Sequence, residues 1–122
     1  MRNKPIEISR RLASIIGLNQ AVVLSRIADE IMEMQESGAG AAFYFHDGDW
    51  WIRRSQADWA KEFPWWSPHT VGRIFKKLRK QALIKTSDQY NEEKSDRTTW
   101  LTVDWYRLGF ALKKGVAYEL GD

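Results

Sequence analysis

The sequence that decides the fold is the run FPWWSPHTVGRIFKKLRKQALI, Phe63 to Ile84. Ser67 and Pro68 form a strong helix start, because a serine hydroxyl caps the free amides of a first turn and proline suits the first helical position. Pro64 cannot lie inside a helix, so the preceding helix must end before it. The run therefore predicts two helices joined by a tight turn, with the second helix extending to about Gln81.

The predicted second helix has an apolar face and a basic face. At about 100° per residue, four apolar side chains recur at the spacing of a core stripe: Val71, Ile74, Phe75 and Leu78. The opposite face is centred on His69, Arg73, Lys76 and Lys80. Between Glu62 and Asp88 there are six Lys or Arg residues and no acid. Surface helices usually mix both signs of charge, so this face predicts a polyanionic partner, and a solvated basic face is the alternative.

The N-terminal third of the chain is expected to be helical after a flexible arm at residues 1–7. A short helix before Gly17 would turn three apolar side chains inward: Leu12, Ile15 and Ile16. A longer helix would begin after an Asn19 cap and end at the glycine-containing run 37–41. Its apolar side chains recur at helical spacing: Val23, Leu24, Ile27, Ile31 and Met34. Its charged side chains are expected to face water: Arg26, Asp29, Glu30, Glu33 and Glu36.

A change of period after the long helix predicts a short hairpin. Two aromatic runs, 43–46 and 50–53, flank Asp47-Gly48, a dipeptide that suits a two-residue turn. Ser55, with Asp58 three residues later, resembles a capping box and opens a short helix. This short helix is the first of the pair that the tight turn joins.

The C-terminal third predicts a strand, a polar loop, a second strand and a last helix. In order, these are the strand 83–87, the loop 88–97, the run TTWLTVDWY, the helix 106–114 and a loose tail 115–122. A tight helix pair followed by a strand–loop–strand unit is the arrangement of a winged helix-turn-helix. We therefore expect one domain over residues 1–122, mainly α with a small antiparallel β-sheet (α+β), in which 88–97 is the wing.

The predicted helix pair assigns DNA-contacting roles by position. In helix-turn-helix proteins the first residues of the second helix reach base edges, which here gives Ser67, His69, Thr70 and Arg73. Later lysines are expected on phosphates, together with two arginines before the first helix: Lys76, Lys77, Lys80, Arg53 and Arg54. Lys94 and Arg97 in the wing would touch neighbouring backbone, and the acids around them also suit a solvated loop.

Seven tryptophans are more than a core of this size needs. Trp59 and Trp100 are expected in the core, while one of Trp65 and Trp66 packs beneath the second helix and the other stays exposed. Four tryptophans also allow single-stranded DNA to stack beside the basic face: Trp50, Trp51, Trp65 and Trp66. Gly72 weakens its helix by about 1 kcal/mol relative to Ala, which suits either close backbone approach or a tolerated surface position.

Composition argues against an enzyme, a metal site and a cofactor. The chain has no Cys, only two His and no glycine-rich phosphate loop. The group His46, Asp47 and Asp49 is better explained by the hairpin turn than by a metal. No apolar run is long enough for a membrane span, and the N-terminus lacks a signal-peptide core. We therefore expect a soluble, cytoplasmic protein with no small-molecule substrate.

Three stretches carry a family resemblance: GLNQAVVLSRI, WWIRRSQADWAKEFPWWSPHTVGRIFKKLRKQALI and DRTTWLTVDWYRL. Their shared features are a Phe-Pro-aromatic-aromatic-Ser turn, a Thr in the first turn of the recognition helix, a Lys-rich second half, Leu-Ile entering the wing, and an aspartate-basic-threonine stretch before the last strand. Together they resemble the N-terminal winged-helix domain of replication-initiator proteins of phages, plasmids and other mobile elements, including the DnaD-like and replisome-organiser types. The resemblance covers about Ile8 to Leu108 and implies a DNA-binding domain that acts in replication initiation.

Relatives of that kind commonly continue into a second domain that oligomerises or recruits a helicase loader. The present sequence ends at Asp122, which fits either a piece of a longer protein or a stand-alone DNA-binding protein. The resemblance therefore implies the DNA contact, and it does not extend to helicase loading.

Two other functions fit the same residues. A transcriptional regulator would use the same helix, and a bound site at a promoter instead of an origin would distinguish it. A small phage protein-interaction module would use the aromatic surface, so substitution of Trp50 or Trp66 would harm function while DNA binding survived. The first expected partner is double-stranded DNA, and a second copy of the chain or a replication or phage protein are the others.

Overall fold

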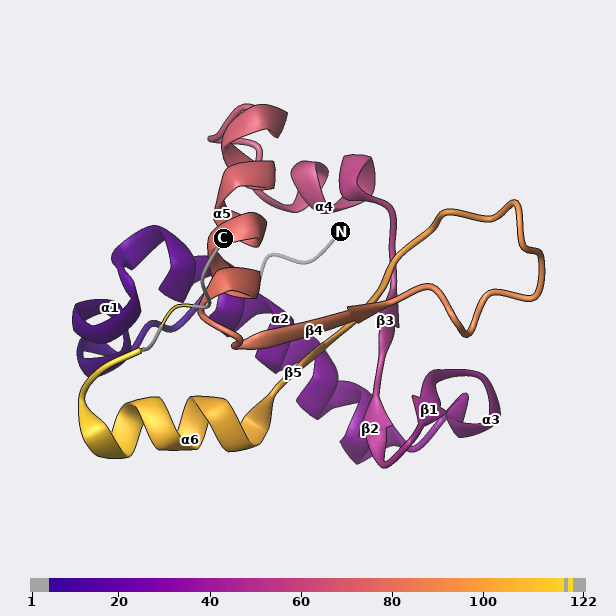
Figure 1. Cartoon of the computed structure of the whole chain (residues 1–122), viewed down its shortest axis with the longest axis horizontal. Coiled ribbons are helices and arrows are strands. Elements are labelled where there is room, and N and C mark those ends of the chain that lie inside the picture. The colour runs from indigo at the N-terminus through magenta and orange to yellow at the C-terminus, as the bar shows by residue number, and fades with distance from the viewer. Residues whose placement is uncertain (1–4, 118, 120–122) are drawn as a thin grey trace.

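The computed structural model describes residues 5–117 and 119, and Figure 1 shows their arrangement. The helices are α1 (Arg10–Ile16), α2 (Leu18–Ser37), α3 (Ala41–Tyr44), α4 (Gln56–Glu62), α5 (Pro68–Lys80) and α6 (Trp105–Lys114). The strands are β1 (Phe45–His46), β2 (Asp49–Trp50), β3 (Ile52–Arg53), β4 (Ile84–Ser87) and β5 (Trp100–Val103). The predicted α+β class is confirmed. The predicted arm 1–7 and tail 115–122 fall partly outside the described residues, at 1–4, 118 and 120–122.

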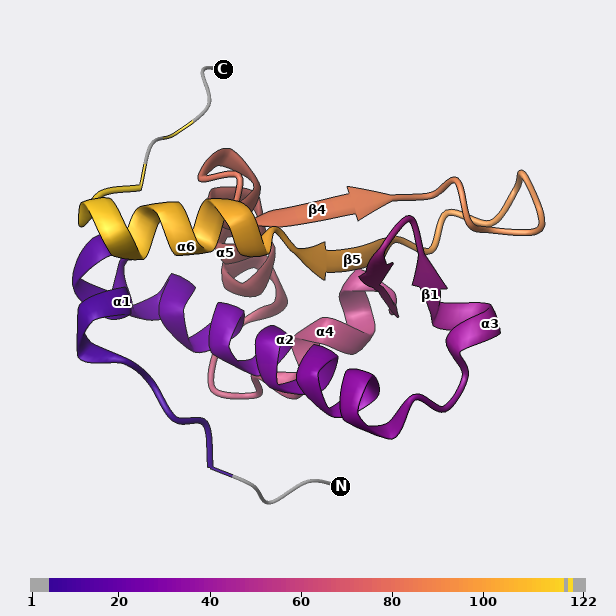
Figure 2. The same ribbon diagram turned by 90° about the horizontal axis from the view of Figure 1, so that it is seen from below.

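A three-stranded antiparallel sheet has the strand order β3-β5-β4. Ile52 of β3 pairs with Leu101 of β5, while β4 pairs along the other edge of β5 from Ile84↔Val103 to Ser87↔Trp100. All four β5 residues are buried, because this strand has a neighbour on each side and helices packed nearby. The loop that joins β4 to β5, residues 88–99, projects away from α1, α5 and α6, toward the end of the molecule where α3 lies, in both views (Figures 1 and 2).

The core forms around α2, which packs against α1, α5 and β5. The predicted apolar stripe of α2 is confirmed: Val23, Leu24, Ile27 and Ile31 are buried, and Met34 packs partly buried against them. Burying each of these larger side chains stabilises the fold by about 1.5–3 kcal/mol relative to leaving it in water. Because α5 lies on the same core, its orientation is fixed by α2.

The start of α2 and its charged side chains differ from the prediction. Gly17 is the N-cap residue, with φ of 100°, and Asn19 lies inside the first turn. The prediction that Arg26 and Glu30 face water is wrong, since their side chains are only 13% and 16% exposed. Arg26 pairs with Glu30 at 2.9 Å and with Glu62 of α4 at 2.7 Å. Helical spacing accounts for the Arg26–Glu30 pair, whereas the contact with Glu62 is a tertiary one that spacing does not reveal.

The predicted hairpin turn is confirmed, while its strands are shorter than expected. Asp47 and Gly48 both have positive φ, 53° and 82°, as the favoured two-residue hairpin turns require. The first half of the predicted strand 43–46 belongs instead to the short helix α3. The predicted strand 50–53 is divided, because Trp50 pairs with Phe45 of β1 whereas Ile52 joins the three-stranded sheet.

The predicted helix pair is present as α4 and α5. The Ser55 hydroxyl accepts a hydrogen bond from the Asp58 amide at 3.1 Å and caps α4. Fully buried Phe63 follows α4, and its carbonyl accepts from the Trp66 amide at 3.1 Å, which closes the turn. Within the described part of the chain, every helix is too short or too polar to cross a membrane.

Candidate nucleic-acid interface

The basic face of α5 points outward because its apolar face is buried. Pro68 occupies the first helical position, and the Ser67 hydroxyl accepts from the Thr70 amide at 3.1 Å. The inner face is the predicted one, with Val71, Ile74, Phe75 and Leu78 all buried. The remaining positions of α5 are therefore presented on the surface of the molecule.

The four predicted base-reading residues share the first two turns of α5. Ser67, His69 and Arg73 are exposed, and Thr70 is half-buried. The Ser67 hydroxyl also donates to Thr70 Oγ1 at 3.0 Å, so the cap uses both of its hydrogen-bonding roles. No hydrogen bond or ion pair among the described residues involves the side chain of His69 or Arg73. These two side chains are the ones that the fold leaves available to an outside partner.

A hollow of about 500 Å³ lies between the start of α2 and the basic face of α5. It brings together five predicted DNA contacts with two residues that were not predicted to bind DNA: Thr70, Arg73, Lys76, Lys77, Lys80, Asn19 and Gln20. The sequence had indicated Asn19 only as a helix cap. The sequence carries only a weak signal that Asn19 lies beside the basic face, because the approach of α2 to α5 is a tertiary feature. We call this space the basic hollow.

The lysines of α5 are not equivalent. Lys76 is exposed and has no ion pair or hydrogen bond within the described part of the chain. Lys77 is paired with the carboxylate of Glu119 from the C-terminal segment. Lys80 is half-buried. Of the lysines predicted to contact phosphate, Lys76 is therefore an exposed cation, and Lys77 already holds an anion.

Arg54, predicted to contact phosphate, is committed within the fold. Its guanidinium donates to both oxygens of Glu30, at 3.1 and 2.8 Å. The same guanidinium lies 4.4 Å from the ring centroid of Trp59, a cation–π distance. With Arg26 on the other side of Glu30, this network ties α2 to the residue after β3 and, through Glu62, to α4. The Arg54 guanidinium is therefore engaged within the fold.

Arg53, also predicted to contact phosphate, reaches the β4–β5 loop. Its Nη2 lies 2.5 Å from Oδ2 of Asp96. The Asp96 carboxylate also accepts from the Thr98 amide at 2.9 Å. The Thr98 hydrogen bonds and then Arg53 lower the pKa of Asp96 to about 2. Arg53 therefore anchors the predicted wing.

The β4–β5 loop is held from inside by Asn91. Its side-chain amide donates to the carbonyls of Asp96 and Thr98 at 3.0 and 2.8 Å. The indole of buried Trp100 donates to the Asn91 oxygen at 2.7 Å. These bonds give the loop a defined path, and both predicted contacts on it, Lys94 and Arg97, are exposed.

The β1–β2 hairpin supports the root of the same loop. The Tyr90 ring stacks on His46, with centroids 4.2 Å apart and planes inclined by 11°. The Tyr90 hydroxyl donates to the Asp47 carboxylate, and this bond raises the pKa of Tyr90. Lys85 of β4 adds an ion pair with Asp49 at 2.8 Å. The sequence indicated the hairpin but not its contact with the loop.

The tryptophans divide largely as predicted. Trp59 and Trp100 are buried, Trp66 packs half-buried against the core, and Trp65 is 59% exposed. Trp51 is buried, which removes one of the four residues predicted as platforms for single-stranded DNA.

Gly72 on α5 stands in open space. A Cβ atom built there would meet nothing within 4 Å. Close approach of another helix of this fold is therefore not the reason for a glycine at that position. Approach of an outside backbone and a tolerated surface glycine are the two explanations that remain.

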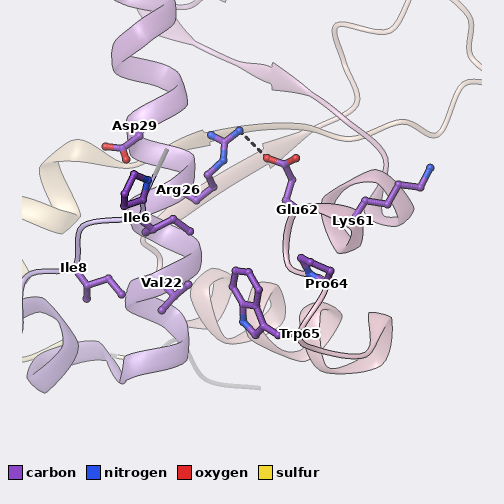
Figure 3. Close-up of a pocket in the computed structure, with 10 residues that line it drawn as sticks. Ile6, Ile8, Val22, Arg26, Asp29, Lys61, Glu62, Pro64 and Trp65 are labelled. Carbon is purple, nitrogen blue, oxygen red and sulfur yellow. Dashed lines mark ion pairs between the residues drawn. The ribbon is translucent and has the colours of Figure 1, made fainter. Parts of the chain in front are cut away.

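A second hollow, of about 910 Å³, has the opposite character (Figure 3). It lies between the N-terminal arm, α2 and the α4–α5 turn, with apolar walls that include Ile6, Val22 and Trp65. Its charged rim combines two carboxylates, Asp29 and Glu62, with two cations, Arg26 and Lys61, and Glu62 is paired with Arg26. Its apolar walls and balanced charges differ from the lining of the basic hollow, which holds cations and no acid.

Comparisons with protein-family models, with curated proteins and with solved structures each find no match for this chain.

Proposed function

We propose that this chain is a winged helix-turn-helix protein that binds double-stranded DNA, with α5 as the recognition helix. The observation that supports this most is the outward face of α5, which carries cations and no acid over its whole length. Two of its exposed cations, Arg73 and Lys76, have no partner among the described residues. Phosphates of DNA are the counter-ions that such a face fits.

The proposed placement of the protein on DNA follows from the size of α5 and the position of the β4–β5 loop. The major groove of B-DNA admits an α-helix, and the first turns of a recognition helix meet base edges there. The β4–β5 loop follows α5 in the chain and carries Lys94 and Arg97 exposed. In this proposal the loop is the wing and lies on the backbone beside the groove.

Sequence reading is assigned to the start of α5 and affinity to its later part. Arg73 can bridge the two major-groove acceptors of guanine, and the Thr70 methyl group can meet the thymine methyl. His69 is the third exposed candidate. Lys76 and Lys80 would hold phosphates, which position the protein and make affinity depend on salt without adding sequence information.

The family resemblance adds a biological role, replication initiation of a phage, plasmid or other mobile element, in the cytoplasm. Transcriptional regulation would use the same interface, and the location of the bound site distinguishes the two roles. Selecting bound fragments from a random pool of DNA gives the site, its symmetry and its spacing. Iterated repeats at an origin would support replication, whereas a palindrome at a promoter would support transcription.

Charge reversal tests the interface directly. The variants Arg73→Glu and Lys76→Glu should each weaken duplex binding at least tenfold in a gel shift, because a carboxylate would then face phosphate. Lys61→Glu is the matched control, since Lys61 is exposed on α4 beside the apolar hollow. Circular dichroism checks that all three variants stay folded. Equal losses for Lys61→Glu and Arg73→Glu would sink the assignment to α5.

A further inference from the structure

The basic hollow is lined by α5 and by the first turn of α2. The position of α2 in a helix-turn-helix protein does not by itself predict a contact with DNA. Four of the residues that line the hollow are cations of α5, and none is an acid. Asn19 and Gln20 line it from the first turn of α2. We infer that the basic hollow holds one backbone phosphate of DNA and that Asn19 is a DNA contact. This inference rests on the proposed function.

The cations supply the first reason. Arg73, Lys76, Lys77 and Lys80 border one space of about 500 Å³. Arg73 and Lys76 have no partner among the described residues, and an anion placed between them would lower their mutual repulsion. A phosphodiester group is small enough for such a space, and it accepts hydrogen bonds on its exposed oxygens.

The start of α2 supplies hydrogen-bond donors on the other side. Gly17 offers no capping side chain, and the first turn of α2 contains no acid. The first helical bond is donated by the Ala21 amide to the Gly17 carbonyl at 2.9 Å, so the earlier amides precede the helical ladder. The side chain of Gln20 is held by its hydrogen bond to the Ile16 carbonyl at 2.8 Å. The side-chain amide of Asn19 is exposed and can turn to a ligand.

One of the cations that line this hollow already holds an anion of the chain. The carboxylate of Glu119, from the C-terminal segment, is paired with Lys77. This contact is independent of the α2 geometry and shows that one lining cation takes a carboxylate as its counter-ion. A DNA phosphate would compete with Glu119 for Lys77, so Glu119→Gln should raise duplex affinity several-fold.

The decisive variant is Asn19→Asp, because it has opposite effects on fold and binding. An aspartate in the first turn interacts well with the helix dipole, so the midpoint of thermal unfolding should stay equal or rise. The same carboxylate would repel a phosphate in the hollow and should weaken binding to a short duplex about tenfold. Gln35→Glu adds the same charge about 24 Å further along α2, beyond the screening length of about 8 Å, and should bind like the unaltered chain.

The outcomes separate this inference from the proposed function. Unchanged affinity of Asn19→Asp, with binding lost in Arg73→Glu, would overturn the phosphate site and leave α5 as the DNA-binding helix. If the unaltered chain bound no duplex, titration with inorganic phosphate would follow the amide signals of Asn19 and Gln20 by NMR. Shifts in that titration would make the hollow a site for free phosphate and overturn the DNA assignment, and no shifts would overturn the site altogether.

Discussion

The rings of Tyr90 and His46 form a parallel stack, with centroids 4.2 Å apart. The Tyr90 hydroxyl also donates a hydrogen bond to Asp47, which lies 43 positions earlier in the chain. The stack joins the β1–β2 hairpin to the root of the β4–β5 loop. The position of the proposed wing is therefore set by a second element as well as by its own strands. The contribution of the proposed wing to DNA binding can be tested by altering its contact with the β1–β2 hairpin.

Tyr90→Ala is expected to uncouple the wing from the hairpin. Without the ring and its hydroxyl, Arg97 would be held less firmly, so Arg97→Gln should cost less affinity in the Tyr90→Ala background than in the unaltered chain. A double-mutant cycle on duplex binding measures this coupling. Tyr90→Phe keeps the ring and should retain most of the coupling. Strict additivity of Tyr90→Ala and Arg97→Gln would show that the hairpin does not position the wing.

Acid is expected to loosen the same loop. The pKa of Asp96 is lowered from 3.8 to about 2, because the ionised carboxylate accepts hydrogen bonds from Thr98 and then pairs with Arg53. A lowered pKa means that this stabilisation is fully present above pH 3.8 and is lost as the pH falls through about 2. The protection of the Thr98 amide, which is the intrinsic exchange rate at each pH relative to its observed rate, should therefore fall over this window. Asp96→Asn should remove the pH dependence, and an unaltered dependence in that variant would assign it to another group.

Arg54 is expected to support stability and not DNA contact. Replacing it with Lys removes the bidentate hydrogen bond to Glu30 and weakens the cation–π contact with Trp59. The free energy of unfolding should therefore fall by about 1–2 kcal/mol. Denaturant unfolding measures this loss. Duplex affinity of the folded variant should not change. A large loss of affinity with unchanged stability would return Arg54 to the interface.

Gly72→Ala is expected to stabilise the protein. The added methyl group meets nothing within 4 Å, and alanine favours a helix interior over glycine by about 1 kcal/mol. Thermal unfolding gives the sign of the change. Duplex affinity then decides between the two explanations for the glycine, since a DNA backbone that approaches Gly72 would be displaced by the methyl group. A lower unfolding midpoint for Gly72→Ala would contradict the open environment.

Local signals in the sequence were sufficient for the helix pair and the faces of α5. Ser55 and Ser67 act on amides three residues away, so their roles could be predicted from spacing alone. The turn at Asp47-Gly48 is equally local, because its positive φ values depend on the two turn residues. The apolar period of α5 likewise fixed which residues are buried.

Contacts between distant segments could not be predicted in this way. The phosphate contact predicted for Arg54 rests on its place before a helix, whereas its partner Glu30 lies 24 positions earlier in the chain. Asn19 was read as a cap because nothing in the sequence shows that α2 begins beside α5. Both residues have charged or polar side chains whose partners are chosen by tertiary packing.

The salt dependence of duplex affinity tests the central claim most directly. Fluorescence anisotropy with a labelled duplex would give Kd across a series of salt concentrations for the unaltered chain and for Lys76→Gln. The account predicts that log affinity falls linearly with log salt, and that Lys76→Gln lowers the slope by about 0.9, the value for one lost phosphate contact. Affinity that does not change with salt, or no duplex binding at low salt, would contradict α5 as a DNA-binding helix.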